Sequence, residues 1–253
     1  MTFGSGKYAP SMARLVQEAK DTGEFDVVHG FTRKDIDQDF ARANAGTLSQ
    51  KRGDGFWLWK PYFVRRVMRE EMQAGDVLFY ADAGCEFKGS PRPYLDLARR
   101  YGFLGFRLSF VVKHWTKGDV FRALDMDMGT FGDERQMVGG IFVMMKTPSI
   151  TRFVDEWLHF ARQPQLVDDS PSAAPNAPGF VEHRHDQAIF TLLVYKHGLA
   201  LVLEDETDKA QYITGLNHFL STSEWYKETR VIFAARGKND LSKQAEKSKT
   251  GTK

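Results

Sequence analysis

Apolar residues recur along this chain at spacings of three and four, a pattern that predicts helices with one buried face. The stripes are Met12, Leu15, Val16 and Ala19; Phe63, Val64, Val67, Met68 and Met72; Ile150, Phe153, Val154, Trp157 and Leu158; and Ile189, Leu192 and Leu193. Pro61 suits the first turn of the second helix. Gly23, Gly75 and Gly198 mark the expected ends of three of these helices.

Short uninterrupted apolar runs between the helices predict buried strands. The clearest run covers 77–81 and ends abruptly at Asp82, as expected of a strand covered on both faces. Further strands are predicted at 25–28, 103–110, 140–145 and 199–203, and a surface loop at 163–179. Strands that alternate with helices predict a layered α/β domain. In such domains ligands bind beyond the carboxyl ends of the strands, where Asp82 lies.

Composition and charge narrow the class of protein. With 253 residues and 42% apolar content, we expect one domain over residues 1–236 and a polar, disordered tail over 237–253. The formal charge is +2, but the tail carries +3, so the remainder gives no case for nucleic-acid binding. Cys85 is the only cysteine, which fits a reducing compartment. Without an apolar run of roughly 18 residues or a signal-peptide pattern, we expect a cytoplasmic protein, with peripheral membrane attachment left open.

The loop Asp82-Ala83-Gly84 is the first candidate site. A carboxylate at the exit of a buried strand can contact a ribose, or it can bind Mg²⁺ or Mn²⁺, which in turn bridge phosphate oxygens. The alternative is structural: Asp82 caps the following turn, and Gly84 supplies its backbone geometry.

Residues 52–62 form the second candidate, because two glycines, two tryptophans and cations precede a predicted helix. Trp57 and Trp59 could stack on a base or a sugar, and Lys60 could neutralise phosphate charge near a helix N-terminus. The alternative is an aromatic cluster that packs a loop onto the core.

Two further segments carry candidate residues. At the start of a predicted helix, Asp186 could accept the proton of an acceptor hydroxyl or simply cap the helix. His183 and His185 lack an evident third ligand, so we do not expect zinc there. Gly139 and Gly140 precede a strand and permit close backbone approach to a ligand, or form a tight turn. Phosphate-loop, dinucleotide-fingerprint and nucleophile-elbow motifs are absent from the sequence.

These features follow one another in an order that resembles a bacterial and viral glycosyltransferase family. The matching stretches are 4–8, 14–20, 25–36, 55–62, 76–86, 115–121, 136–146 and 185–190. The resemblance spans about residues 2–204, and Gly55-Phe56-Trp57-Leu58-Trp59-Lys60-Pro61-Tyr62 is its most distinctive part.

The resemblance implies a GT-A fold, with a Rossmann-like, mixed, mostly parallel sheet flanked by helices. It implies a nucleotide-binding half over about 1–88 and an acceptor half over about 89–236. It also implies transfer of a sugar from a nucleotide-sugar donor, such as a UDP-sugar, to a hydroxyl of a glycan or of a polysaccharide or lipid-linked precursor. The residues matched to the nucleotide are Thr2, Phe3, Thr32, Lys60, Asp82, Ala83 and Gly84. Those matched to the donor sugar or acceptor are Trp57, Trp59, Gly139, Gly140, His185 and Gln187, with Asp186 as the catalytic carboxylate.

Two departures from the family pattern leave alternatives open. Gly84 replaces the second carboxylate of the DXD-like motif, and Glu86 lies about 13 Å further along an extended chain. Binding of Mn²⁺ or Mg²⁺ by Asp82 and charge neutralisation by Lys7, Arg52 or Lys60 therefore both remain possible. In addition, Met1 falls where the first strand should already have run. The rival functions are a nucleotide-sugar or glycan-binding protein without catalysis and a sugar-phosphate nucleotidyltransferase.

Overall fold

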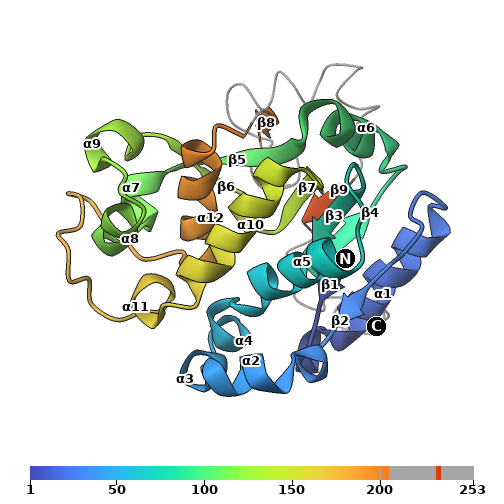
Figure 1. Cartoon of the computed structure of the whole chain (residues 1–253), viewed down its shortest axis with the longest axis horizontal. Helices are drawn as coiled ribbons and strands as arrows, with labels where there is room; N and C mark the ends of the chain where they lie inside the picture. Colours follow the sequence, from blue (N-terminus) through green and yellow to red (C-terminus); the bar gives the residue numbers. More distant parts are fainter. Residues whose placement is uncertain (200, 205–231, 235–253) are drawn as a thin grey trace, which may run out of the picture.

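A computed structural model describes residues 1–199, 201–204 and 232–234 of the chain (Figure 1). Its strands are β1 (Thr2–Phe3), β2 (Gly30–Phe31), β3 (Val77–Ala81), β4 (Cys85–Phe87), β5 (Phe103–Val111), β6 (Arg135–Met137), β7 (Ile141–Met145), β8 (Leu201–Glu204) and β9 (Ile232–Ala234). Its longer helices are α1 (Ala9–Asp21), α5 (Trp59–Glu70), α6 (Arg92–Tyr101), α10 (Pro148–Ala161) and α12 (His185–Lys196). The short ones are η1 (Gly6–Tyr8), η2 (Arg33–Asp35), α2 (Gln38–Ala43), α3 (Ala45–Leu48), α4 (Gly53–Phe56), α7 (Val112–Trp115), α8 (Gly118–Ala123), α9 (Met128–Phe131) and α11 (Pro164–Val167).

The largest sheet is mixed. β7 pairs antiparallel with β3 on one side and with β5 on the other, β6 pairs antiparallel with β5, and β8 pairs parallel with β5. The parallel pair β1–β2 lies beside β3, because the Met1 amine donates to the Phe79 carbonyl and the Ala81 amide donates to the Met1 carbonyl. The mixed α/β class is confirmed. The prediction of a mostly parallel sheet is wrong for the central sheet. β6 and β7 run opposite to β3 and β5, so every pair that they form is antiparallel.

The break between β6 and β7 lies beside the end of β3. β6 and β7 run in the same direction along β5, and Val138, Gly139 and Gly140 separate them. The Val138 amide still bonds to the Phe106 carbonyl, and the Gly140 carbonyl accepts from the Asp82 amide. The interruption therefore places the glycine pair directly beside the end of β3.

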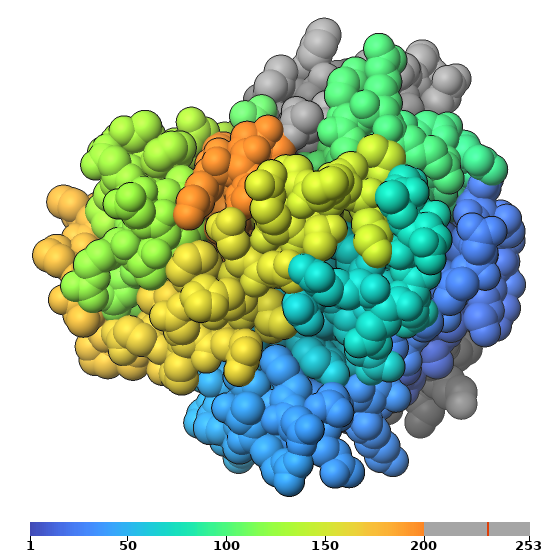
Figure 2. All heavy atoms as spheres, viewed as in Figure 1, coloured from blue at the N-terminus to red at the C-terminus, as the bar shows by residue number. Residues whose placement is uncertain are grey.

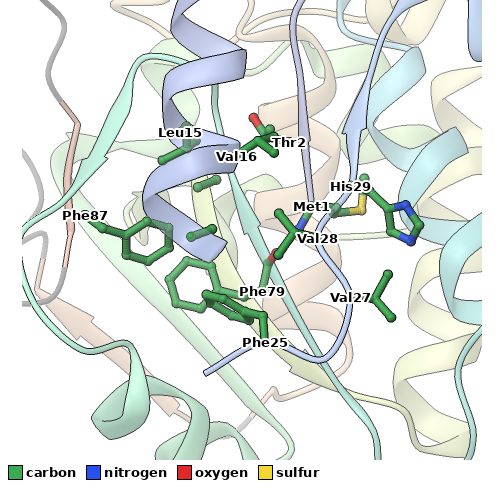
Figure 3. Close-up of a pocket in the computed structure, with 12 residues that line it drawn as sticks. Met1, Thr2, Leu15, Val16, Phe25, Val27, Val28, His29, Phe79 and Phe87 are labelled. Carbon is green, nitrogen blue, oxygen red and sulfur yellow. The ribbon is translucent and has the colours of Figure 1, made fainter. Parts of the chain in front are cut away.

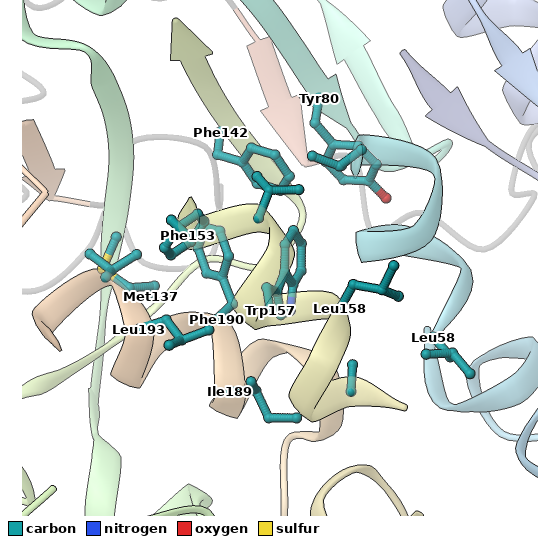
Figure 4. Packing of buried hydrophobic residues seen from close by; sticks show 14 of the residues in the cluster. Leu58, Tyr80, Met137, Phe142, Phe153, Trp157, Leu158, Ile189, Phe190 and Leu193 are labelled. Atoms are coloured by element: carbon teal, nitrogen blue, oxygen red, sulfur yellow. The ribbon is translucent and has the colours of Figure 1, made fainter. Parts of the chain in front are cut away.

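Helices cover both faces of the sheet. Successive side chains of a strand point to opposite faces, so Leu78 and Tyr80 face α5, α10 and α12, whereas Phe79 and Ala81 face α1 and α6. The first face holds the larger core, in which Phe142, Phe153, Trp157 and Phe190 pack ring against ring (Figure 4). Figure 2 shows α10 at the surface with part of α12 beside it, while most residues of α12 are buried.

The opposite face holds a small apolar pocket beneath α1 (Figure 3). Leu15, Val16 and Ala19 line it from the helix, and Phe79 and Phe87 from the strands. Its lining is almost entirely apolar, so the pocket belongs to the packing of α1 on the sheet.

Most elements predicted from the apolar pattern are present, within a few residues of the expected bounds. The strand predicted at 25–28 is wrong: this segment is irregular, and Val27 is 62% exposed. Phe25 is partly buried and contacts the rings of Phe79 and Phe87 without strand pairing. The loop predicted at 163–179 contains the one-turn helix α11. The tail at 237–253 lies outside the described residues.

Within the described residues, no helix combines the length and the apolarity that a membrane span requires.

Candidate functional site

Lys60 is the centre of a buried polar cluster between α5, β3 and α12. It belongs to the apolar stripe of α5, three and four residues before Phe63 and Val64, so its side chain points toward the sheet. It is 3% exposed. Its ammonium donates to the Gly139 carbonyl at 2.7 Å and lies 3.5 Å from Asp82 Oδ1 and 3.4 Å from Asp186 Oδ2. Three oxygen acceptors thus surround a group that has three donors.

Asp82 forms the exposed side of this cluster. It follows β3 directly and lies on the same face as Tyr80, whose hydroxyl donates to Asp82 Oδ1 at 2.5 Å. The Asp82 carbonyl closes a turn by accepting from the Cys85 amide, while its side chain remains 43% exposed. The structural alternative, in which the Asp82 side chain caps the turn, is therefore not what the structure shows.

Asp186 forms the buried side. It lies in the first turn of α12, ahead of the apolar positions Ile189, Phe190 and Leu193. Trp157 Nε1 donates to its backbone carbonyl at 3.2 Å. Its side chain is 4% exposed, and Oδ2 pairs with the Lys60 ammonium at 3.4 Å without forming a hydrogen bond of good geometry. Burial raises the pKa of Asp186 to about 7, although the charge of Lys60 opposes this shift.

The charges of the cluster depend on one another. Burial alone would lower the pKa of Lys60, but the charges of Asp186 and Asp82 outweigh it, so the pKa is raised and the ammonium stays protonated. Near neutral pH one ammonium is therefore shared between an ionised carboxylate and a carboxyl that is close to its titration point. Such a carboxyl can accept or release a proton with little cost.

Five consecutive residues before α5 have left-handed backbone geometry. Gly53, Asp54, Gly55, Phe56 and Trp57 have φ values of 59°, 52°, 98°, 50° and 59°. Only glycine adopts this region freely, so the other three residues carry strain. The turn is closed by bonds from the Phe56 amide to the Arg52 carbonyl and from the Trp57 amide to the Gly53 carbonyl.

This left-handed turn joins the aromatic residues to His185. The His185 ring, itself on a residue with φ of 53°, packs on Phe56 and Trp57 with ring centroids 5.2 Å from each. Trp59 stacks on Phe3 at 3.9 Å and donates from Nε1 to the Gly53 carbonyl. Trp59 is therefore buried, whereas Trp57 is partly exposed.

The glycine pair and Gln187 bring α12 and β3 close together. A Cβ at Gly140 would lie 2.7 Å from Asp82 Oδ2, and one at Gly139 would lie 3.0 Å from the Gln187 side chain. Gln187 Nε2 donates to the Met137 carbonyl at 2.6 Å. The missing side chains at 139 and 140 therefore make room for residues of the protein itself.

Other predicted residues lie apart from the cluster. Thr2 lines the apolar pocket beneath α1, and Phe3 points to the opposite face and stacks on Trp59. Thr32 caps η2 and donates its hydroxyl to Asp35 Oδ2. Ala83 and Gly84 form the turn after Asp82. None of these residues joins Lys60, Asp82 and Asp186.

The Lys60 ammonium contacts both carboxylates of the cluster, Asp82 and Asp186, which a divalent cation would need as ligands. Asp82 Oδ1 already contacts the Tyr80 hydroxyl and lies near the Lys60 ammonium, which would repel a cation. Glu86, the next carboxylate along the chain, pairs with Lys88. Among the described residues no group of three or more His, Cys, Asp or Glu side chains could hold a metal ion. The cluster does not fit Mn²⁺ or Mg²⁺ as it stands, and no step below is assigned to a metal.

Sequence reasoning missed Tyr80, whose hydroxyl donates to the Asp82 carboxylate. The signal was available, because a strand places residues i and i+2 on one face, and Tyr80 precedes Asp82 by two within the apolar run 77–81. The strain at residues 53–57 was also missed. Two glycines indicated a turn, but not the positive φ of the three residues between and after them.

Comparison with known proteins gives no assignment: no protein-family model matches the chain, and no curated protein matches it significantly.

Proposed function

We propose that this protein is a glycosyltransferase that moves a sugar from a nucleotide-sugar donor to a hydroxyl acceptor. The observation that carries the proposal is Asp186, a buried carboxyl with a pKa of about 7, which Lys60 links to the strand-end Asp82. The mixed sheet with helices on both faces and the order of the sequence motifs are compatible with a GT-A fold.

In the proposed reaction the acceptor oxygen attacks the anomeric carbon of the donor sugar. The bond between that carbon and the diphosphate oxygen breaks, and the nucleoside diphosphate leaves with the electron pair. Asp186 takes the proton of the attacking hydroxyl, for which a pKa near the working pH is favourable. Asp82, with its exposed carboxylate, would bind hydroxyls of the donor, and Lys60, which contacts both carboxylates, would hold them in position.

Asp186 is almost fully buried, so the proposal requires side chains around it to move when substrates bind. The strained turn at residues 53–57, which ends in the partly exposed Trp57, is a candidate for such movement, because strained backbone clusters at ligand clamps and switch regions.

The test is release of nucleoside diphosphate from a panel of UDP-, GDP- and dTDP-sugars with glycan acceptors, with and without Mn²⁺. Asp186→Asn should lower the rate about 10²-fold or more. Asp155→Asn is the matched control, because Asp155 also pairs with basic residues, Arg65 and Arg69, but lies away from the cluster. Wild-type turnover by Asp186→Asn, or no turnover with any donor, would contradict the proposal.

The burial of Asp186 also favours a second candidate, a nucleotide-sugar-binding protein without catalysis. Saturable binding of a nucleotide sugar in calorimetry, combined with no product in the same samples after prolonged incubation, would establish this second function instead.

A further inference from the structure

Tyr80 belongs to the buried polar cluster and lies on the same face of β3 as Asp82. Its side chain is fully buried, and its ring stacks on Phe142 with centroids 4.7 Å apart (Figure 4). The Lys60 ammonium lies 5.2 Å from the centre of the Tyr80 ring. Contacts with an aromatic ring and with an ammonium therefore hold the Tyr80 ring in one place, and the ring fixes the position of its hydroxyl.

The two side chains that hold Asp82 contact the same carboxylate oxygen. The Tyr80 hydroxyl donates to Oδ1 at 2.5 Å, and the Lys60 ammonium lies 3.5 Å from Oδ1. Burial raises the pKa of Tyr80 well above its ordinary value and the charge of Asp82 raises it further, so the phenol keeps the proton that it donates. Among the described residues the side-chain contacts of this carboxylate therefore fall on Oδ1, and Oδ2 is left to a ligand.

Gly140 leaves room for the orientation that Tyr80 imposes on Asp82. A Cβ at residue 140 would lie 2.7 Å from Asp82 Oδ2, so a larger residue there would push this oxygen away. The Asp82 amide donates to the Gly140 carbonyl at 2.8 Å, which keeps the two backbones at this spacing. Because the Asp82 side chain is 43% exposed whereas Tyr80 and Lys60 are buried, a ligand can approach the carboxylate from the solvent side.

We propose that Tyr80 is a positioning residue for donor binding: it holds Asp82 by Oδ1, so that Oδ2 is presented to a hydroxyl of the donor. The inference rests on the proposed function, which makes the ligand a nucleotide sugar. An ionised carboxylate only accepts hydrogen bonds, and its charge repels phosphate oxygens. The group that binds at Oδ2 is therefore a hydroxyl of a sugar ring rather than the diphosphate.

Removal of the hydroxyl alone tests this role. In Tyr80→Phe the ring and its stacking on Phe142 remain, but Asp82 Oδ1 loses its fixed donor and the carboxylate can rotate. The KM for the nucleotide sugar should rise about tenfold, a factor that the loss of one hydrogen bond to a charged group can produce. The kcat should stay within about twofold, because Asp186 and Lys60 are retained and only binding is weakened.

Tyr94→Phe is the matched control. Tyr94 is also a buried tyrosine, but its hydroxyl has no hydrogen-bond partner among the described residues, and its ring packs on Phe79 and Phe106 on the opposite face of the sheet. This variant should keep both KM and kcat. A double-mutant cycle with Asp82→Ala then separates positioning from a general structural effect. Without the Asp82 carboxylate, Tyr80→Phe should change the KM no further.

A measurement without substrate separates this inference from the proposed function. In protein whose aspartates carry ¹³C at the side-chain carboxyl carbon, the Asp82 signal is assigned by its loss in Asp82→Ala. This signal should shift in Tyr80→Phe and stay in place in Tyr94→Phe. If the signal does not move in Tyr80→Phe, or if turnover is present and the KM is unchanged or rises equally with and without Asp82, Tyr80 is not a positioning residue. If the signal shifts but no nucleotide sugar binds or reacts, Tyr80 still positions Asp82 and the transferase function fails.

Discussion

The carboxyl of Asp186 is expected to make stability depend on pH. Burial raises its pKa from the ordinary aspartate value of 3.8 to about 7 in the fold. Below pH 3.8 both states are protonated and the contribution of Asp186 is fully present. As the pH rises from 3.8 toward 7, ionisation of Asp186 lowers the free energy of the unfolded chain, whereas Asp186 in the folded protein stays largely protonated. This difference lowers the free energy of unfolding by up to roughly 4 kcal/mol.

Asp186→Asn should remove this slope. In urea titrations between pH 4.5 and 7.5, the free energy of unfolding of the wild type should fall relative to that of the variant. Two profiles that stay parallel over this range would mean that Asp186 titrates normally. Lys60 does not enter this window, because its pKa is raised from an already high value.

The absence of a side chain at residue 140 is expected to matter because of Asp82. A Cβ at Gly140 would lie 2.7 Å from Asp82 Oδ2, so Gly140→Ala should destabilise the protein by about 1–3 kcal/mol through overpacking. Chemical denaturation of the single variants and of Gly140→Ala/Asp82→Ala measures the coupling. The cost of the alanine should shrink when Asp82 is truncated, and equal costs in both backgrounds would mean that this contact is not the reason.

At the scale of elements, the left-handed turn at residues 53–57 depends on its glycines. A Cβ at Gly53 would lie 2.2 Å from the Trp57 ring, so Gly53→Ala should displace Trp57 and lower the Tm by several degrees. Gly46→Ala is the control, because Gly46 lies in α3 with no atom within 4 Å of the added carbon, and alanine favours a helix. A Gly53→Ala variant as stable as Gly46→Ala would show that the turn adapts freely.

Sequence patterns predicted elements well where one face is buried throughout. Helix α5 was predicted from the apolar stripe of Phe63, Val64 and Val67. Strand β3 was predicted with its observed bounds from the apolar run 77–81. The pattern failed at 25–28, because Phe25 is partly buried by ring contacts rather than by strand pairing, and Val27 is exposed. Left-handed backbone at Phe56 and Trp57 was equally beyond reach, because tertiary packing on His185 imposes a conformation that neither residue favours alone.

At the scale of the whole molecule, the meeting of Lys60, Asp82 and Asp186 could be expected, because each begins or ends an element that packs on one sheet face. The sequence could not tell how closely they are buried. The sequence also did not reveal that β6 and β7 run antiparallel to their neighbours β3 and β5. Strand direction depends on the connections between strands, which apolar periodicity does not encode.

The larger core should behave as one cooperative unit that also supports the polar cluster. Trp157 is fully buried, packs on Phe142, Phe153 and Phe190, and donates to the Asp186 carbonyl. Trp157→Ala should therefore cost about 3–5 kcal/mol by leaving a cavity. Tyr101→Ala, at a residue 41% exposed, should change stability by less than about 0.5 kcal/mol.

Urea unfolding followed by circular dichroism and by fluorescence tests both the size and the cooperativity of the Trp157→Ala effect. Coincident transitions in the wild type and in both variants are expected for a single core. Because Trp157 bonds to the residue that carries the proposed base, Trp157→Ala should also lower nucleoside diphosphate release under conditions where the variant is still folded. If the two probes separated in the wild type, or if Trp157→Ala were as mild as Tyr101→Ala, α10 and α12 would not form one core with the sheet. Asp186 would then be held by local contacts alone.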